Sequence, residues 1–270
     1  MAEWSEEIQI AKARNELVVK DNKLLQTVTR RKYELGTQEQ KALGYLLSLI
    51  QLGDENKKPP YIYTFDTKIF CDICGINRDS GSNLQSIKKS LDSLAENSFW
   101  LDYGGGEFRF QWIVTPDIHR GEGVINVEIP SMVFPYLVGL TENFTEYELW
   151  QILPMKSAYS IALFELLKSY AYKHVVVVLL EQLRAYLAVG DKYHDFRNFQ
   201  RKVLDMAKRE INDLTDLTID WRGIRNGRSY NAIEFTIATK KDLDVVEAYR
   251  RSKAILNGIK HTEGQINIFE

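Results

Sequence analysis

The chain has 270 residues, of which 44% are hydrophobic and 27% are charged, and its formal net charge is −2. These values are typical of a folded chain and leave room for two domains, each with its own core. No stretch reaches the ~20 apolar residues of a membrane span, and residues 1–12 lack the basic and apolar runs of a secretory signal. We therefore expect a cytoplasmic protein that does not contact membranes.

The first part of the chain contains an N-terminal extension at residues 1–15, a predicted strand at 16–19 and a predicted helix at 22–33. Thr37 and Gln40 have the spacing of a capping box and open the next predicted helix. Helix, strand, two helices and a β-hairpin then follow at residues 37–51, 61–65, 67–74, 82–96 and 99–113. Three consecutive glycines at 104–106 suit the turn of this hairpin.

The middle of the chain is expected to hold a loop at 116–123, a strand at 124–129 and a short helix at 130–140 that Pro135 interrupts. We place a domain boundary at 139–143, where apolar sequence gives way to polar residues. The first order of elements then returns at residues 157–172, 175–178, 180–189, 194–214 and 217–238. A charged helix at 240–257 and a flexible tail at 258–270 are expected to complete the chain.

Helix, strand, two helices and a hairpin are the elements of a winged helix, a helix-turn-helix variant whose third helix normally enters the DNA major groove. Two copies of this order predict an α+β protein that is rich in helices, has small antiparallel hairpins and contains two tandem winged-helix domains. We place these domains at residues 16–140 and 141–257. Double-stranded DNA is the expected partner, and the second domain is expected to read most of its sequence.

The third helix of the second copy has an apolar side and a basic side. The apolar side chains recur at helical spacing and are expected to face the core: Phe196, Phe199, Val203, Ala207, Ile211 and Leu214. The basic side carries Arg197, Asn198, Arg201, Lys202, Lys208 and Arg209. Arginine pairs with guanine and asparagine with adenine, so this side is expected to read bases. An ordinary solvated face is the alternative, because Asp205 and Glu210 lie among the basic residues.

Further basic residues flank this helix. Lys192 precedes it, and the following hairpin carries Arg222, Arg225 and Arg228, which we expect to contact DNA phosphates. Residues 192–228 contain nine Lys or Arg and six Asp or Glu, so this segment is locally positive although the whole chain is not.

The third helix of the first copy is less basic. Asn83, Gln85, Ser86, Lys88 and Lys89 are expected to face outward, with Asp92 and Glu96 behind them. Two positive charges suit contact with the DNA backbone better than base reading, because phosphate contacts set affinity. We expect Asn83, Ser86, Lys88 and Lys89 to touch DNA.

Sequence features of enzymes and metal sites are missing. The chain has no Gly-x-x-x-x-Gly-Lys-[Ser/Thr] phosphate-binding loop, and none of its four histidines lies within two positions of another. Cys71 and Cys74 are compatible with a redox pair or half of a zinc site, but no second ligand pair accompanies them, so buried thiols are favoured. We expect no enzymatic activity, no cofactor and no metal.

Three segments resemble a known family. Residues 157–170, Ser-Ala-Tyr-Ser-Ile-Ala-Leu-Phe-Glu-Leu-Leu-Lys-Ser-Tyr, are similar to the Ser-x-Tyr-x-x-x-Leu-Tyr-Glu-Leu-Leu segment of plasmid replication initiators of the RepA/RepB type, with Phe164 in place of the usual tyrosine. Residues 196–204, 210–212 and 215–217 resemble the recognition helix and following strand of these iteron-binding, tandem winged-helix proteins. Residues 15–22 resemble their first strand. The resemblance covers residues 16–238, and its C-terminal half is the specific part.

This resemblance implies a non-enzymatic initiator. Members of the family bind direct repeats, called iterons, at a theta-type origin as monomers, help to open adjacent A/T-rich DNA, and recruit the host initiator and the replicative helicase. As dimers joined mainly through the N-terminal domain, many repress their own promoter at an inverted repeat, which contributes to plasmid copy control. A winged-helix transcriptional repressor without an origin role is the alternative, and it would need only a palindromic site.

Strands of the first domain also predict self-association. Residues 99–103, 108–112 and 124–129 are apolar, and an open strand edge is a ready template for pairing with another copy. We expect a monomer–dimer equilibrium in which the monomer binds direct repeats and the dimer binds an inverted repeat.

The C-terminal residues carry a separate signal. Residues 265–269, Gln-Ile-Asn-Ile-Phe, resemble the peptide Gln-Leu-[Ser/Asp]-Leu-Phe by which bacterial replication proteins bind the sliding clamp of the replicative polymerase. Gln265 offers amide hydrogen bonds, Ile268 and Phe269 would fill an apolar pocket, and residues 258–264 would serve as a flexible tether. A frayed terminus or a strand packed on the domain are the alternatives.

Overall fold

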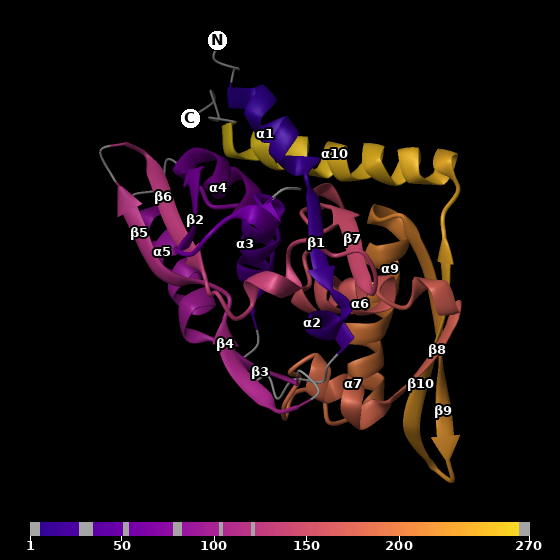
Figure 1. The fold of residues 1–270 in the computed structure, drawn as a ribbon. Helices are drawn as coiled ribbons and strands as arrows, with labels where there is room; N and C mark the ends of the chain where they lie inside the picture. Colours follow the sequence, from indigo (N-terminus) through magenta and orange to yellow (C-terminus); the bar gives the residue numbers. More distant parts are fainter. Residues whose placement is uncertain are drawn as a thin grey trace.

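The fold is described from a computed structural model of the chain (Figure 1). The residues described are 6–26, 35–50, 54–77, 83–102, 105–119 and 122–264. The expected helix at 22–33 falls partly outside them, and its described part is the short helix α2 (Asn22–Gln26).

The N-terminal elements tie distant parts of the chain together. Helix α1 (Glu6–Arg14) leads into strand β1 (Leu17–Asp21), which precedes α2. Strand β7 (Phe144–Glu148) pairs with β1 in antiparallel register. Neither α1 nor β7 was predicted from the sequence. Because β7 follows the boundary expected at 139–143, backbone hydrogen bonds cross that boundary.

The first repeat has the predicted order of elements. They are α3 (Thr37–Ser48), β2 (Tyr61–Asp66), α4 (Thr67–Cys74), α5 (Asn83–Glu96), β3 (Ser98–Asp102), β4 (Glu107–Gln111), β5 (Val114–His119) and β6 (Val124–Ile129). Strands β3 and β4 form a two-stranded hairpin, and a three-stranded antiparallel sheet has the order β2-β6-β5. The three helices pack together beside these strands, with Phe70, Leu91 and Leu94 fully buried.

Strand β5 replaces the loop expected at 116–123. Pro116 lies where the pairing of β5 with β6 shifts register between Val114 and Asp117. Thr115 beside it has a positive φ of 49°. Proline is tolerated at such an irregularity because no ladder hydrogen bond needs its missing N–H. Strand β6 is consequently flanked by β2 and β5, so the expectation that residues 124–129 offer an open edge was wrong.

The hairpin β3–β4 turns most of its large apolar side chains inward. Phe99, Leu101 and Phe110 are buried, whereas Trp100 is 46% exposed. In the part of the chain that the structure describes, no third strand pairs with this hairpin. Its outer edges are therefore open, but the apolar surface expected at 99–103 and 108–112 is mainly core.

Residues 130–140 do not form the expected helix. They fold into turns with one 3₁₀ segment, Phe134–Tyr136, that has Pro135 in its first turn. Pro130 and Pro135 lack backbone N–H donors, which removes hydrogen bonds that a longer helix would need.

Helix α3 starts differently from the prediction. Its N-cap residue is Gly36, with no side-chain capping bond, so Thr37 and Gln40 do not form a capping box. The Thr37 hydroxyl instead donates to the carbonyl oxygen of Lys156 (3.2 Å), and the Gln40 amide donates to that of Ala158 (3.1 Å). These side chains join the first repeat to the start of the second.

The second repeat also follows the predicted order. Its elements are α6 (Ala158–Lys168), β8 (Val175–Leu179), α7 (Leu180–Tyr186), α8 (Phe196–Phe199), a π-helical turn (Gln200–Leu204), α9 (Asp205–Leu214), β9 (Leu217–Asn226), β10 (Ser229–Thr239) and α10 (Asp242–Gly264). Strands β8, β10 and β9 form an antiparallel sheet in that order. Helix α10 includes residues 258–264, which were expected to belong to a flexible tail.

The two repeats share one hydrophobic core. Helix α6 packs against both α9 and α3, and its residues from Tyr159 to Leu167 are buried. Helix α10 crosses the top of the molecule in Figure 1 beside α1, so the two ends of the described chain lie close together. It contacts the 3₁₀ turn Leu149–Gln151, where Trp150 and Tyr249 meet edge to face with ring centroids 5.2 Å apart.

A buried ionic cluster lies where β1, β7 and α6 meet. The Lys20 ammonium group and the Tyr147 hydroxyl both donate hydrogen bonds to the same carboxylate oxygen of Glu165. The Lys20 side chain is only 3% exposed, so its charge depends on Glu165 for compensation.

Candidate nucleic-acid interface

The third helix of the second repeat, formed by α8, the π-turn and α9, separates an apolar from a basic side. It begins after Asp195, whose carboxylate accepts a hydrogen bond from the backbone N–H of Asn198. The predicted core positions are confirmed for Phe199, Val203, Ala207, Ile211 and Leu214, which are all buried. The N-terminal half of the opposite side consists of the exposed residues Arg197, Asn198, Arg201 and Lys202.

The π-turn changes the direction of the side chains that follow it. Buried positions 199, 203, 207 and 211 are four apart, and a regular α-helix of 3.6 residues per turn would spread them over about 120°. The π-turn contains one extra residue, which rotates the following side chains back by about 100° and so keeps the four buried positions on one side of the helix. The same rotation turns Lys208 and Arg209 away from Arg201 and Lys202. The repeated spacing of four was the sequence signal for this turn.

Two of the expected contact residues already have partners within the protein. Lys208 forms an ion pair with Asp220 at 2.7 Å. Arg222 forms two hydrogen bonds with Glu234, at 2.6 and 2.8 Å. This pairing raises the pKa of Arg222 and lowers the pKa of the Glu234 carboxyl. The charges of Lys208 and Arg222 are therefore compensated locally.

Glu210 does not belong to the solvated face that the alternative interpretation assumed. Its carboxylate is buried and accepts hydrogen bonds from the backbone N–H groups of Lys156 (2.8 Å) and Ser157 (3.3 Å). These two groups precede α6, so Glu210 stabilises the start of that helix. One of the two acidic residues that weakened the prediction of a basic face thus points inward.

An aromatic stack joins the wing, formed by β9 and β10, to the third helix. The ring of Phe196 stacks on that of Tyr230, with centroids 4.0 Å apart and planes inclined by 18°. The Arg225 guanidinium lies 4.4 Å from the centroid of the Tyr230 ring and donates a hydrogen bond of 2.8 Å to its hydroxyl group. A Cβ atom at Gly223 would lie 2.6 Å from the Tyr230 ring, so this close approach requires glycine.

The tip of the wing carries uncompensated charge. Gly227 has a φ of 62°, which allows the tight turn that presents Arg228. Among the described residues, six exposed basic side chains of the helix and wing have no ion pair: Arg197, Arg201, Lys202, Arg209, Arg225 and Arg228. Six of the nine basic residues of segment 192–228 thus remain as available positive charge, and all of these except Arg209 lie on the first turns of the helix or on the wing.

Arg184 positions the loop before the third helix, a role that was not predicted from the sequence. Its guanidinium donates to the carbonyl oxygens of Tyr193 (3.0 Å), Lys192 (2.8 Å) and Gly190 (3.4 Å). It also lies 5.2 Å from the ring centroid of Phe199. The exposed Lys192 is presented by this loop. No local pattern distinguishes Arg184 in the sequence, because its partners are backbone carbonyls.

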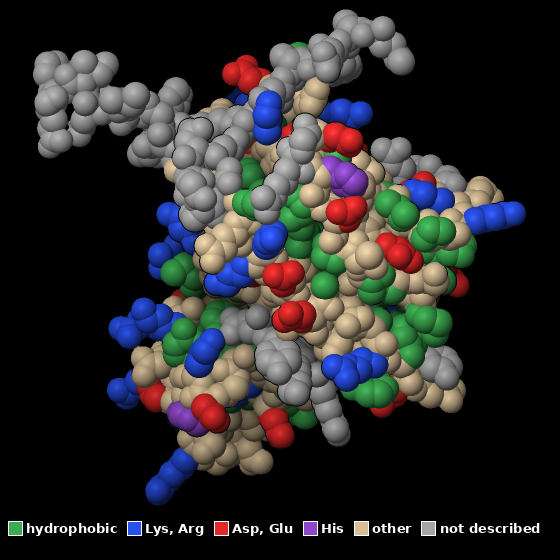
Figure 2. Space-filling view, turned by 90° about the vertical axis from the view of Figure 1, so that its left-hand side faces the viewer, with side chains coloured by type: hydrophobic (Ala, Val, Ile, Leu, Met, Phe, Trp, Pro, Cys, Tyr) green, Lys and Arg blue, Asp and Glu red, His purple; other side chains and the backbone are tan. Residues whose placement is uncertain are grey.

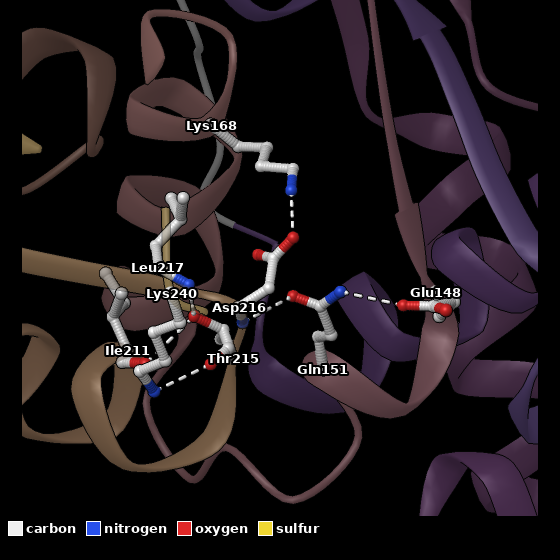
Figure 3. A network of polar contacts seen from close by, with 8 residues as sticks. All are labelled: Glu148, Gln151, Lys168, Ile211, Thr215, Asp216, Leu217 and Lys240. Carbon is white, nitrogen blue, oxygen red and sulfur yellow. Dashed lines mark hydrogen bonds and ion pairs between the residues drawn. The ribbon is translucent and has the colours of Figure 1, made fainter. Parts of the chain in front are cut away.

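Figure 3 shows how the turn between α9 and β9 is fixed. The Thr215 hydroxyl donates to the carbonyl of Ile211 (2.9 Å) and accepts from the backbone N–H of Leu217 (3.1 Å). The Lys240 ammonium group donates to the Thr215 carbonyl (2.7 Å). These bonds hold the helix and the wing at a defined mutual angle.

The same turn is anchored to distant elements (Figure 3). Asp216 forms an ion pair with Lys168 of α6, and its backbone N–H donates to the side-chain oxygen of Gln151 (3.1 Å). The Gln151 amide in turn donates to Glu148 at the end of β7 (3.1 Å). Polar contacts therefore connect the basic face to the strand that pairs with β1.

The third helix of the first repeat, α5, has the predicted inward residues Ile87, Leu91 and Leu94 buried. Lys88 and Lys89 are exposed and Ser86 is partly exposed, whereas the side chain of Asn83 lies outside the described part of the structure. Figure 2 shows the side of the molecule that the first repeat forms, and its basic side chains are interspersed with acidic and hydrophobic ones.

Other sequence predictions concern cysteines, metals and the C-terminus. Cys71 and Cys74 are buried free thiols, as predicted, and burial raises the pKa of Cys74. Within the described ranges, no group of three or more His, Cys, Asp or Glu side chains could hold a metal ion, and no helix is long and apolar enough to cross a membrane. Gln265, Ile268 and Phe269 lie outside the described residues.

Comparison with known proteins gives two curated relatives from Escherichia coli. A replication initiation protein is 24% identical over 135 residues, which cover 47% of this chain and 41% of that protein. The PI protein is 28% identical over 151 residues, which cover 49% of this chain and 48% of that protein. The matches thus span less than half the length of either relative.

A solved structure extends the likeness over most of the fold. The crystal structure of the Pi initiator protein in complex with iteron DNA matches 85% of this chain and 99% of that chain, with a TM-score of 0.65 and 19% identity. Two family models match in sequence order: the WH1 domain of initiator replication proteins at residues 17–168 and their WH2 domain at residues 179–237. The chain therefore belongs to the initiator replication protein family and contains its two tandem winged-helix domains.

Proposed function

We propose that this protein initiates plasmid replication by binding direct repeats (iterons) in double-stranded origin DNA. Family membership supports this proposal, as does the likeness to the Pi initiator, which was crystallised with iteron DNA. The observation that carries the proposal is the basic face that Arg197, Arg201 and Lys202 form beside Arg225 and Arg228 of the wing. These charges have no ion-pair partner among the described residues, so they are available for DNA.

Within this proposal the helix and the wing have different tasks. Arg197, Asn198, Arg201 and Lys202 lie on the first turns of the helix, the part that contacts base edges in helix-turn-helix proteins. Arg225 and Arg228 project from the wing and bind phosphates, which fixes the register of the helix in the groove. Lys208 and Arg222 contribute less, because contact with DNA would require each to exchange a carboxylate partner for a phosphate.

The first domain adds contacts of lower specificity. Lys88, Lys89, Ser86 and Asn83 contact the DNA backbone through α5. The open edges of the hairpin β3–β4 support a monomer–dimer equilibrium, in which the monomer takes direct repeats and the dimer takes an inverted repeat at the protein's own promoter.

Host replication proteins are the remaining proposed partners. Binding to repeats beside A/T-rich DNA places the host initiator and the replicative helicase where strands open. The peptide that contains Gln265, Ile268 and Phe269 binds the polymerase sliding clamp. Because α10 continues to Gly264, the peptide follows a helix end and not the flexible tether that the sequence suggested.

The test is a replication assay in cells. The gene and its flanking DNA are placed on a circle that has no other origin, and transformants are counted. The native sequence should establish the circle, whereas the double variant R197A/R201A, produced at the same level, should not. Establishment by the double variant would contradict the proposed role of this helix. A purely transcriptional repressor would yield no transformants with either sequence.

A further inference from the structure

Strand β8 is an unprotected sheet edge. It lies at the outside of the sheet of the second repeat, and β10 is its one strand neighbour in the described chain (Figure 1). Its sequence is Val-Val-Val-Val-Leu, and Val175, Val177 and Leu179 are 49%, 54% and 49% exposed. Edge strands usually carry a charge, a proline or a bulge that prevents pairing with another chain. None of these lies within β8.

The same three residues also direct their backbone groups outward. The backbone N–H of Ile237 donates to the carbonyl oxygen of His174 at 2.7 Å, which fixes the phase of the antiparallel ladder between β10 and β8. Hydrogen-bonded residues alternate in such a ladder, so Val176 and Val178 bond to β10. Val175, Val177 and Leu179 therefore present both N–H and C=O groups at the open edge.

We propose that β8 is the site at which a second copy of this chain pairs, antiparallel and about a twofold axis at Val177. In this register Val177 faces Val177 of the second copy, and Val175 faces its Leu179. About six hydrogen bonds would form between the chains. The two sheets become one, and the exposed valine and leucine side chains of both copies lie on one continuous face.

Charged residues at the two ends of β8 favour this register. Lys173 and Glu181 lie four positions before and after Val177, and both are exposed. The twofold arrangement brings Lys173 of each copy to the end of the strand where the other copy has Glu181, so two opposite-charge contacts form. A parallel pairing in register would place like charges together at both ends. The residues that flank the strand are thus complementary in charge between two copies when the strands pair antiparallel.

The proposed contact leaves the basic face open. β8 pairs with β10 at residues 232–236, whereas the wing turn lies at residues 226–229. Pairing at β8 is separate from dimerisation through the first domain and does not depend on it.

Disulfide cross-linking of the full-length protein tests this pairing. The twofold axis places the two Val177 Cα atoms about 5.5 Å apart, which suits a disulfide. The native cysteines are buried. The Val177→Cys variant should form cross-linked dimers under mild oxidation at least tenfold faster than Leu243→Cys, which changes an 84% exposed residue of α10. Equal rates for the two variants would overturn the proposal, because they would indicate random collision.

Charge exchange in the Val177→Cys background makes the test specific. Lys173→Glu alone and Glu181→Lys alone each create two like-charge contacts and should slow cross-linking roughly tenfold. The double exchange restores both opposite-charge pairs and should restore the rate. Unchanged rates in the single variants, no recovery in the double variant, or cross-links in a lysate only to other proteins would overturn the proposal. Thermal unfolding of every variant confirms that it is folded.

Discussion

Phe196, in the first turn of the recognition helix, stacks on Tyr230, in a strand of the wing, with ring centroids 4.0 Å apart. This contact makes one rigid surface from two elements that are separated in the sequence. Arg225 packs on the ring of the same tyrosine and donates a hydrogen bond to its hydroxyl group. Because Tyr230 also stacks on Phe196, the orientation of the Arg225 side chain depends on the position of the helix. The residues that we propose to read bases and to bind phosphates are therefore held in one register before DNA binds.

The first prediction concerns the glycine under this stack. Gly223→Ala places a Cβ atom 2.6 Å from the Tyr230 ring, so the ring must move. We expect a loss of about 1–3 kcal/mol in the free energy of unfolding, measured in urea, because overpacking forces side chains from their preferred positions. The matched control is Gly258→Ala in α10, where no atom lies within 4 Å. It should be neutral or stabilising by up to about 1 kcal/mol. Equal effects of the two changes would contradict the role of Gly223.

The second prediction separates the helix from the wing. Arg197→Ala or Arg201→Ala should cost about 1–3 kcal/mol of binding free energy on the cognate repeat and little on random DNA, because base contacts carry discrimination. Arg225→Ala or Arg228→Ala should weaken binding to both DNAs alike. It should also reduce the log–log salt slope by roughly 0.9 for each phosphate that the variant no longer neutralises. Fluorescence anisotropy at several salt concentrations measures both effects.

The ion-paired Arg222 is the control for the wing. It is exposed like Arg225, but two hydrogen bonds hold it to Glu234. Arg222→Ala should change the salt slope by clearly less than Arg225→Ala does. Identical behaviour of the helix and wing variants, or a larger effect at Arg222 than at Arg225, would show that this division of tasks is wrong.

Sequence periodicity was sufficient for the order of elements in both repeats and for the buried side of the recognition helix. It failed where partners are distant in the sequence. Strand β7 forms because it pairs with β1, which lies more than 120 residues earlier in the chain. Arg184 donates to backbone carbonyl oxygens, which every residue has, so no sequence pattern reveals its role. Ideal helical geometry placed Lys208 beside Arg201, but the π-turn separates them. The sequence predicted Glu210 to be a surface charge. The prediction failed because the N–H groups that bind its carboxylate, those of Lys156 and Ser157, lie far from it in the sequence.

The third prediction concerns the buried ionic cluster. Lys20→Met leaves the Glu165 carboxylate buried without its cation, so the free energy of unfolding should fall by about 3–5 kcal/mol. The double variant Lys20→Met/Glu165→Gln removes both charges and should recover most of this loss. Urea unfolding of the three proteins gives the comparison. A double variant no more stable than Lys20→Met would show that packing, and not the unpaired charge, explains the loss.

The fourth prediction is a pH dependence at Lys41 in α3. Burial lowers the pKa of Lys41 to about 8, although electrostatic interactions with the nearby Cys74 and Glu210 oppose the shift. The unfolded chain, with an ordinary lysine pKa, binds more protons between pH 8 and about 10.4, so this residue destabilises the fold fully below pH 8 and progressively less above it.

Replacement of Lys41 tests this shift. Lys41→Met should raise the free energy of unfolding by about 3 kcal/mol at pH 7. The advantage should shrink to less than half of that at pH 9.5, because the native lysine is neutral in the folded state there. Urea unfolding at the two pH values measures it. A difference between variant and native protein that is the same at both pH values would contradict the lowered pKa.

A footprint of the full-length protein on the DNA that flanks its own gene tests the central claim most directly. The proposed function predicts protection of several direct repeats beside an A/T-rich segment, with loss of that protection in R197A/R201A and retention in R222A. Protection of a single palindrome without direct repeats, or of direct repeats equally in R197A/R201A, would contradict it.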